Sequence, residues 1–342
     1  MYTRRGRTPR FRRPSQASRP EPLVGAVLTT PDDTPVHRLK LLAALSAVYF
    51  GWGSTFLATR YAVETLPPLT ITALRALVAG VILFALYYRK AGMPSRLQWR
   101  SAWIGGTLLF LGGQATMTRA MTLVPSGLSA LILTSMALWL VLLHWLQPSG
   151  RAPTRREAVG LVVSTVGMVI LLAPSAAAAA TVNPVGAAML LAAAFCWALG
   201  SLYSRGAALP RSAGMGTAAQ LITGGLMVLV FAVVLGEPAQ IDSAAFTPRT
   251  VFSLAYLIVL GTLIGFSAYS WLLQNAPTPA LLGSYAYVNP MVAMLLGWAV
   301  GGEALSRRTL VAMVVVVVGV ALVVSKRRPP QALAAAVVAP RP

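Results

Sequence analysis

With 342 residues, of which 56% are hydrophobic and only 11% charged, the chain has too few charges to cover a soluble protein of this length. The formal net charge of +20 does not favour nucleic-acid binding, because nine Lys or Arg precede residue 41 and most others stand in short links between apolar runs. This distribution is typical of the cytoplasmic loops of membrane proteins, and we expect no nucleic-acid partner.

The chain begins with a basic tail, residues 1–38, whose content of Pro, Arg and Ser predicts a disordered cytoplasmic segment. It has no apolar core, so we do not expect a signal peptide, and its charge suits anionic lipid headgroups. Residues 326–342 form a second predicted cytoplasmic tail. Between the tails lie ten apolar runs of about 20 residues, the length that crosses a bilayer: 39–60, 70–88, 102–122, 126–146, 157–173, 184–204, 213–235, 250–273, 280–301 and 308–325.

Basic residues predict the orientation of these spans. With ten spans both termini lie on the same side, and cytoplasmic termini place nine basic residues in the first three cytoplasmic links: Arg89, Lys90, Arg96, Arg100, Arg151, Arg155, Arg156, Arg205 and Arg211. The outer links then contain Arg249, Arg307 and Arg308. The bias favours a multi-pass protein of the cell (inner) membrane with both termini inside, and the last two arginines run against it.

Similar stretches occur in the same order in the two halves. Gly53-Ser54 aligns with Gly200-Ser201, the stretch LRALVAG with AQLITGG, and Pro125 with Pro279. We therefore expect two five-helix units, residues 39–173 and 184–325. Because five is odd, the second unit enters the membrane from the opposite side, which predicts an all-α integral membrane fold of two inverted repeats.

The ninth span contains an unusual polar patch. Asn289 and Pro290 stand inside an apolar segment, and proline removes a backbone donor, so we expect a helix break at Pro290. Tyr285 and Tyr287 place hydroxyls within one turn of that break. Irregular backbone at membrane depth is tolerated inside protein or beside a watery cavity, so the patch predicts a substrate pathway, with a packing kink as the alternative.

At these residues the sequence resembles the ten-helix EamA-type transporters of the drug/metabolite transporter superfamily, most closely their YedA-like members. The stretches that carry the resemblance are WGSTFLATRYAVETLPPLTITALRALVAG, VPSGLSALI, SYAYVNPMVAMLLGWAVGGEALS and the closing GVALVV. The resemblance implies a ten-helix bundle with a central cavity, alternating access, and transport of small metabolites, often export of amino acids or related compounds. It also implies cavity positions at Trp52, Ser54, Gln114, Trp197, Ser201, Tyr285 and Asn289. The chain departs from the pattern at Met136, where many relatives have proline, and at Gly302-Glu303, which has no partner in the first half.

Two arginines inside predicted spans are candidate ligands for an anionic group such as a carboxylate. Arg75 and Arg119 both approach the outer side, and the alternative for each is that it extends to the membrane surface. Trp52 and Trp197 are candidates for substrate contact or for core packing.

Missing residue types limit the chemistry. No span has a central Asp or Glu, so the sequence offers no obvious carboxylate for a proton relay. Facilitated exchange or downhill efflux is therefore at least as compatible with the sequence as proton antiport. The single cysteine, Cys196, leaves no Cys-based metal site, and we expect no cofactor. An intramembrane hydrolase would need a base, and the histidines are limited to His37 and His144, so we expect no enzyme.

Import of small polar metabolites stays open as an alternative to export, and the oligomeric state is not predicted.

Overall fold

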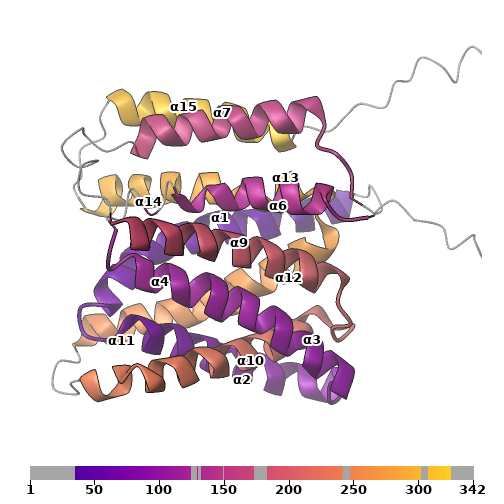
Figure 1. The fold of residues 1–342 in the computed structure, drawn as a ribbon, viewed down its shortest axis with the longest axis vertical. Coiled ribbons are helices and arrows are strands. Elements are labelled where there is room, and N and C mark those ends of the chain that lie inside the picture. The colour runs from indigo at the N-terminus through magenta and orange to yellow at the C-terminus, as the bar shows by residue number, and fades with distance from the viewer. Residues whose placement is uncertain are drawn as a thin grey trace, which may run out of the picture.

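The computed structural model describes residues 35–124, 129, 132–148, 150–172, 183–241, 247–301 and 307–324. Within these ranges every regular element is a helix, and the helices form ten spans arranged side by side (Figure 1). Four residues that the sequence analysis placed in the N-terminal tail, 35–38, belong to the first helix. The rest of that tail, the tail 326–342, Pro125 and Gly302-Glu303 lie outside the described residues.

The first five spans consist of the following elements: α1 (Pro35–Ala62), α2 (Pro68–Ala91), a continuous third span of α3 (Arg96–Gly106), η1 (Thr107–Ala115) and α4 (Thr116–Ala120), then α6 (Ser135–Trp145) and α7 (Arg155–Leu172). The second five are α9 (Pro184–Gly206), α10 (Ala213–Val234), a continuous eighth span of α11 (Pro248–Tyr256), η4 (Leu257–Ile264) and α12 (Gly265–Asn275), a ninth of α13 (Pro279–Gly283) and α14 (Tyr285–Gly301), and α15 (Arg307–Val324). A short 3-10 helix, η2 (Glu237–Gln240), follows α10.

Length and composition make five described segments suited to crossing a membrane: Pro68–Ala91, Pro184–Gly206, Ala213–Val234, Pro248–Asn275 and Pro279–Leu296. Several of these helices begin with proline in the first turn, where its missing N–H is not needed. Polar caps complete the starts, as where Asn183 accepts hydrogen bonds from the backbone N–H groups of Val185 and Gly186.

The spans pack in pairs that join the two halves of the chain. Helix α2 lies along α10, and α7 lies along α15, each with the helix at the same place in the other half (Figure 1). A Cβ atom on Gly160 would lie 2.7 Å from the Gly319 carbonyl oxygen, and one on Gly319 would lie 2.8 Å from the Gly160 carbonyl. The α7–α15 contact therefore requires glycine on both helices, as in other close helix pairs in membranes.

The third and eighth spans each contain a π-helical segment, η1 and η4. In each span a threonine hydroxyl bonds the carbonyl five residues earlier, Thr116 to Leu111 at 3.0 Å and Thr262 to Leu257 at 2.9 Å. Such segments are rare and often occur at functional sites. Both lie beside the central cavity described below.

The predicted helix break at Pro290 is wrong in its position. The helix is interrupted at Ser284, and α14 runs through Pro290. The Ser284 hydroxyl bonds back to the Leu281 carbonyl at 2.6 Å and shares a 2.5 Å hydrogen bond with the Tyr49 hydroxyl of α1. A serine that bonds the preceding turn bends a helix, and the contact with Tyr49 holds that bend against α1.

Candidate substrate cavity

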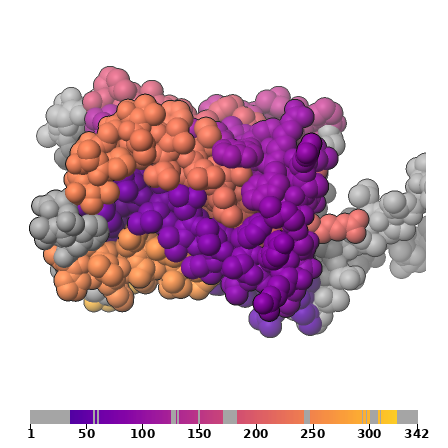
Figure 2. Space-filling view, turned by 90° about the horizontal axis from the view of Figure 1, so that it is seen from below, coloured from indigo at the N-terminus to yellow at the C-terminus, as the bar shows by residue number. Residues whose placement is uncertain are grey.

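A cavity of about 140 Å³ lies between α1, α2, the third span, α6, α9, η4 and α14. Both halves of the chain supply its walls. On the face that Figure 2 shows, residues of the first half (purple) lie between two groups of residues of the second half (orange). The lining includes the charged group Arg75, the amides Gln114 and Asn289, and the hydroxyls Thr55, Thr59, Thr72 and Thr118. The apolar lining includes Ile71, Leu133 and three methionines, Met117, Met121 and Met136.

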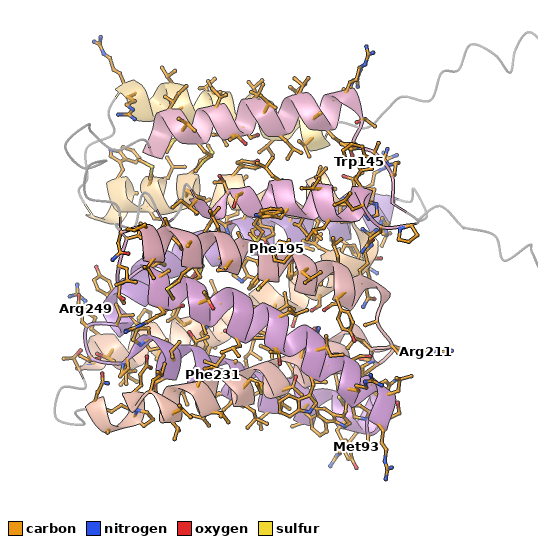
Figure 3. All side chains as sticks on the ribbon, in the orientation of Figure 1. Met93, Trp145, Phe195, Arg211, Phe231 and Arg249 are labelled. Carbon is orange, nitrogen blue, oxygen red and sulfur yellow. The ribbon has the colours of Figure 1, made fainter. Side chains whose placement is uncertain are left out.

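The cavity extends toward one end of the bundle. Thr59 is near the end of α1, Ile71 is near the start of α2, and Met121 follows α4, so these three liners lie where the first spans turn. Arg249 marks the same end (Figure 3), since its guanidinium carbon lies 3.8 Å from the centre of the Tyr61 ring at the end of α1. Met93, Trp145 and Arg211 lie at the opposite end (Figure 3).

A layer of aromatic rings closes the cavity toward that opposite end. We name Trp52, Trp197, Phe266, Tyr269 and Tyr285 the aromatic layer. The Trp52 ring centre lies 5.7 Å from Trp197, 5.3 Å from Phe266, 5.2 Å from Tyr269 and 5.1 Å from Tyr285. Ring centres within 4.5–7 Å in tilted or edge-to-face arrangements attract one another.

Hydrogen bonds fix the orientation of the layer. The Trp52 Nε1–H donates to the Gly261 carbonyl at 2.8 Å, and the Trp197 Nε1–H donates to the Tyr269 hydroxyl at 3.1 Å. The Tyr285 hydroxyl donates to the Met136 sulfur at 3.3 Å. Every polar atom of these rings has a hydrogen-bond partner, so the layer is held in one arrangement, and Trp52, Trp197 and Tyr285 present it as one wall of the cavity.

Glycines of the third and eighth spans leave room for the two tryptophans. A Cβ atom on Gly113 would lie 2.9 Å from Trp197 Cε3, and one on Gly265 would contact the Trp52 indole. The tryptophan of α1 thus packs on the eighth span, and the tryptophan of α9 packs on the third. The two halves of the chain use the same arrangement.

Asn289 lines the cavity and also ties the interrupted ninth span to α1. In the amide orientation that satisfies its hydrogen bonds, its nitrogen donates to the carbonyls of Tyr285 at 3.2 Å and Tyr49 at 3.1 Å. The Gln114 amide, half-buried in η1, makes no side-chain hydrogen bond within the described residues.

Arg75 is the charged residue of the cavity. Its side chain is 7% exposed, and its Nε is buried without a hydrogen-bond partner. Within the described part of the chain no carboxylate lies in the cavity wall. A guanidinium is always charged in proteins, so this arrangement leaves a buried positive charge facing the cavity.

The structure brings seven of the predicted site residues to the cavity: Trp52, Arg75, Gln114, Trp197, Tyr285, Asn289 and Pro290. The other four lie elsewhere. Ser54 accepts from the Tyr256 hydroxyl at 2.8 Å, Ser201 bonds the Tyr269 hydroxyl at 2.6 Å behind the aromatic layer, and the Tyr287 hydroxyl bonds Thr165 at 3.1 Å. Arg119 is exposed at the end of α4, in a separate surface hollow that also contains Glu237.

Sequence reasoning missed the methionine and threonine walls and two members of the aromatic layer, Phe266 and Tyr269. Thr55 is three residues after Trp52, and Thr59 is four residues after Thr55, so the three side chains lie near one face of the helix. That spacing could have indicated them. Phe266 and Tyr269 stand in an apolar span without a motif, and no sequence signal separates them from core residues.

Comparison with known proteins agrees with this architecture. The chain is 33% identical over 277 residues to the "Uncharacterized inner membrane transporter YedA" of Escherichia coli (strain K12), covering 80% of this chain and 87% of that protein. It is 23% identical over 262 residues to the "Uncharacterized transporter YoaV" of Bacillus subtilis (strain 168), covering 76% and 88%. A protein of known crystal structure superposes with a TM-score of 0.65 at 21% identity, covering 84% of this chain and 97% of that one, which supports the fold alone.

A family model described as "EamA-like transporter family" matches the chain twice, at residues 39–173 and 184–325. The two matches span most of the chain, and the similarity to YedA covers four-fifths of it. This is a family of membrane transporters and not of enzymes, so the hydrolase considered from the sequence is set aside. The resemblance inferred from the motifs is confirmed, and the chain belongs to the EamA-like transporter family.

Proposed function

We propose that the protein is a secondary transporter that exports small metabolites, amino acids or related compounds, by alternating access through the central cavity. The observation that carries this proposal is a cavity between the halves of the chain that extends to one end of the bundle and is closed toward the other by the aromatic layer. A carrier in one of its two access states has this geometry.

The packing of the halves supports the inverted repeat in this proposal. Each of α2 and α7 lies along the helix at the same place in the other half, α10 and α15. The two tryptophans occupy matching pockets, Trp52 at Gly265 and Trp197 at Gly113. An approximate two-fold axis between units 39–173 and 184–325 accounts for both pairings.

The distribution of basic residues supports the orientation. Met93, Trp145 and Arg211, which stand in or beside the first three predicted cytoplasmic links, lie at the end of the bundle away from Arg249 (Figure 3). We therefore assign these links, with their nine basic residues, to that end. In this orientation both termini are cytoplasmic in the cell (inner) membrane, and the cavity faces outward. The aromatic layer is then the inner barrier.

The proposal is tested by measuring metabolite release and uptake in cells that lack the protein and in cells that express it. We expect one class of small metabolite to leave at least tenfold faster with the intact chain. Asn289→Ala should abolish this gain, because it removes a cavity wall and its bonds to Tyr285 and Tyr49. The matched control is Asn275→Ala, since Asn275 ends α12 away from the cavity and bonds the Trp271 carbonyl at 2.8 Å.

The outcomes separate the alternatives. If a metabolite enters the expressing cells faster and is not released faster, the protein is an importer and the proposed export is wrong. Equal behaviour of the Asn289→Ala and Asn275→Ala proteins would remove the cavity from the mechanism. Unchanged release and uptake of all metabolites would overturn the proposed function.

A further inference from the structure

We infer that the cargo is a small apolar monocarboxylate with net negative charge, and that the inside-negative membrane potential drives its export. This inference rests on the proposed function and narrows its cargo, from amino acids or related compounds to related carboxylic acids that lack the amino group. The observation behind it is the charge balance of the cavity, in which one guanidinium has no counter-charge.

Arg75 lies about two turns from the start of α2, with its head group in the cavity wall. It is more than nine-tenths buried, and within the described residues no hydrogen bond or ion pair to its guanidinium is found. A buried charge without a partner strongly destabilises a protein in a membrane, and intramembrane arginines are normally paired. A carboxylate on the cargo would supply the missing partner through two parallel N–H···O bonds.

A positive charge on the cargo would meet no carboxylate in the described part of the cavity wall, only neutral amide and hydroxyl oxygens such as that of Gln114. The described acidic side chains lie elsewhere: Glu64 is exposed near the end of α1, Glu157 binds Arg151 at 3.1 Å, and Glu237 accepts from the Thr70 N–H at 2.9 Å. The ammonium group of a free amino acid would therefore meet no carboxylate there.

Aromatic faces could hold an ammonium group instead, but the rings that reach the cavity, Trp52, Trp197 and Tyr285, also pack against one another or against the rest of the layer. Trp52 is surrounded by four rings of its own layer, with ring centres 5.1–5.7 Å away. A cation must lie over a ring face to be attracted. The packing of the layer thus favours a cargo that carries the carboxylate and not the amine.

The rest of the wall is mostly apolar, with the Gln114 amide and four threonine hydroxyls among the apolar side chains, so it suits a cargo with an apolar chain. Met117, Met121 and Met136 supply flexible apolar surface beside Leu133 and Ile71. The volume of about 140 Å³ is close to the roughly 150 Å³ of an engineered apolar cavity that holds benzene. A chain of about six carbon atoms fits this volume. Because the cavity extends to one end of the bundle, the volume sets no upper limit on the length of the cargo.

The same charge balance sets the direction of transport. When the carboxylate binds, the Arg75 charge is neutralised, so the loaded carrier reorients without net charge at the site and the empty carrier returns with one positive charge. Each cycle moves one negative charge outward, without a proton partner. For one charge, a potential of about 100 mV corresponds to roughly a fiftyfold concentration ratio in favour of export.

Binding to the purified full-length protein tests the substrate class. Three probes share one carbon skeleton: 4-methylpentanoate, its uncharged amide 4-methylpentanamide, and the zwitterion leucine. We expect saturable thermal stabilisation by the acid and at least tenfold weaker binding of the amide and of leucine. Arg75→Gln should weaken acid binding at least tenfold, and Arg249→Gln, outside the cavity, should leave it unchanged.

Three binding results would overturn the inference: leucine binding as well as the acid, acid affinity that survives Arg75→Gln, or no response to the acid. The probe comparison on the unaltered protein decides the question even where Arg75→Gln does not fold. The second measurement is current from proteoliposomes after a jump in acid concentration. We expect a current of one sign with the acid and none with the amide.

Electroneutral transport of leucine would overturn the cargo class and leave the transporter function standing. Failure of the proposed function has a different signature, which is unchanged release and uptake of every metabolite in whole cells.

Discussion

Replacing Tyr269 with phenylalanine removes one hydroxyl from the aromatic layer and leaves the ring packing intact. That hydroxyl accepts the Trp197 indole N–H at 3.1 Å and shares a 2.6 Å hydrogen bond with Ser201. Tyr269 is 1% exposed, so water does not reach the vacated position. The substitution therefore isolates the contribution of the hydrogen bonds.

The expected magnitude follows from which groups lose their partner. The Ser201 hydroxyl keeps its 2.6 Å bond to the Trp197 carbonyl, whereas the Trp197 indole N–H is left with none. An orphaned buried donor costs about 1–3 kcal/mol, while hydrogen bonds between membrane helices average about 0.6 kcal/mol and reach about 1.7. We expect Tyr269→Phe to lower the free energy of unfolding by roughly 1–2 kcal/mol.

Equilibrium unfolding in mixed micelles by titration with a denaturing detergent measures this loss. The matched control is Tyr256→Phe on the same span, where a half-buried hydroxyl donates to Ser54 at 2.8 Å. Because water can replace that partner, the control should lose less than about 1 kcal/mol. If the two variants differ by less than about 0.5 kcal/mol, the reasoning that hydrogen bonds hold the layer is refuted.

Two further changes test the cavity and the start of α2. Gly113→Ala places a Cβ atom 2.9 Å from Trp197 Cε3, so the ring must shift, and we expect metabolite release in cells to fall at least tenfold. Glu237→Gln weakens the bond that the carboxylate accepts from the Thr70 N–H in the first turn of α2, and we expect a loss of about 1 kcal/mol in unfolding free energy.

Each of these changes has a control in the chain. Gly216→Ala adds a Cβ atom whose nearest neighbour is 3.6 Å away, an ordinary contact, so release should be unchanged. Glu64→Gln alters an exposed carboxylate and should leave stability unchanged. Normal release by the Gly113→Ala protein, or equal stability of the two glutamine variants, would contradict the corresponding account.

The ten spans could be predicted from sequence because the bilayer sets the length of an apolar helix, and ten apolar runs of that length are present. Seven of the predicted site residues line the cavity: the family resemblance implied five of them, and Arg75 and Pro290 were named because an arginine and a proline are unusual inside an apolar run. Proline predicted irregularity in the ninth span, but the interruption lies at Ser284, where a hydroxyl bond to Tyr49 of α1 holds the bend. A contact between spans far apart in sequence decides that position.

The rotation of each helix about its axis explains why some predicted site residues do not line the cavity. Tyr285 and Tyr287 are two residues apart, so they point to nearly opposite faces of α14, and only packing decides which face meets the cavity. Tyr285 lines it, and Tyr287 bonds Thr165 of α7. Arg75 and Arg119 were both candidates in sequence, yet Arg75 is buried with no partner among the described residues, and Arg119 is exposed.

The amino-acid sequence by itself determined the membrane class, the number of spans, the family and the residue types available for binding. Each of these follows from local composition, spacing or motif. The tertiary structure decided which of those residues share a cavity, that aromatic rings line one end of it, and that Arg75 faces it with no counter-charge among the described residues. These are properties of how helices rotate and pack against one another, and no single span encodes them.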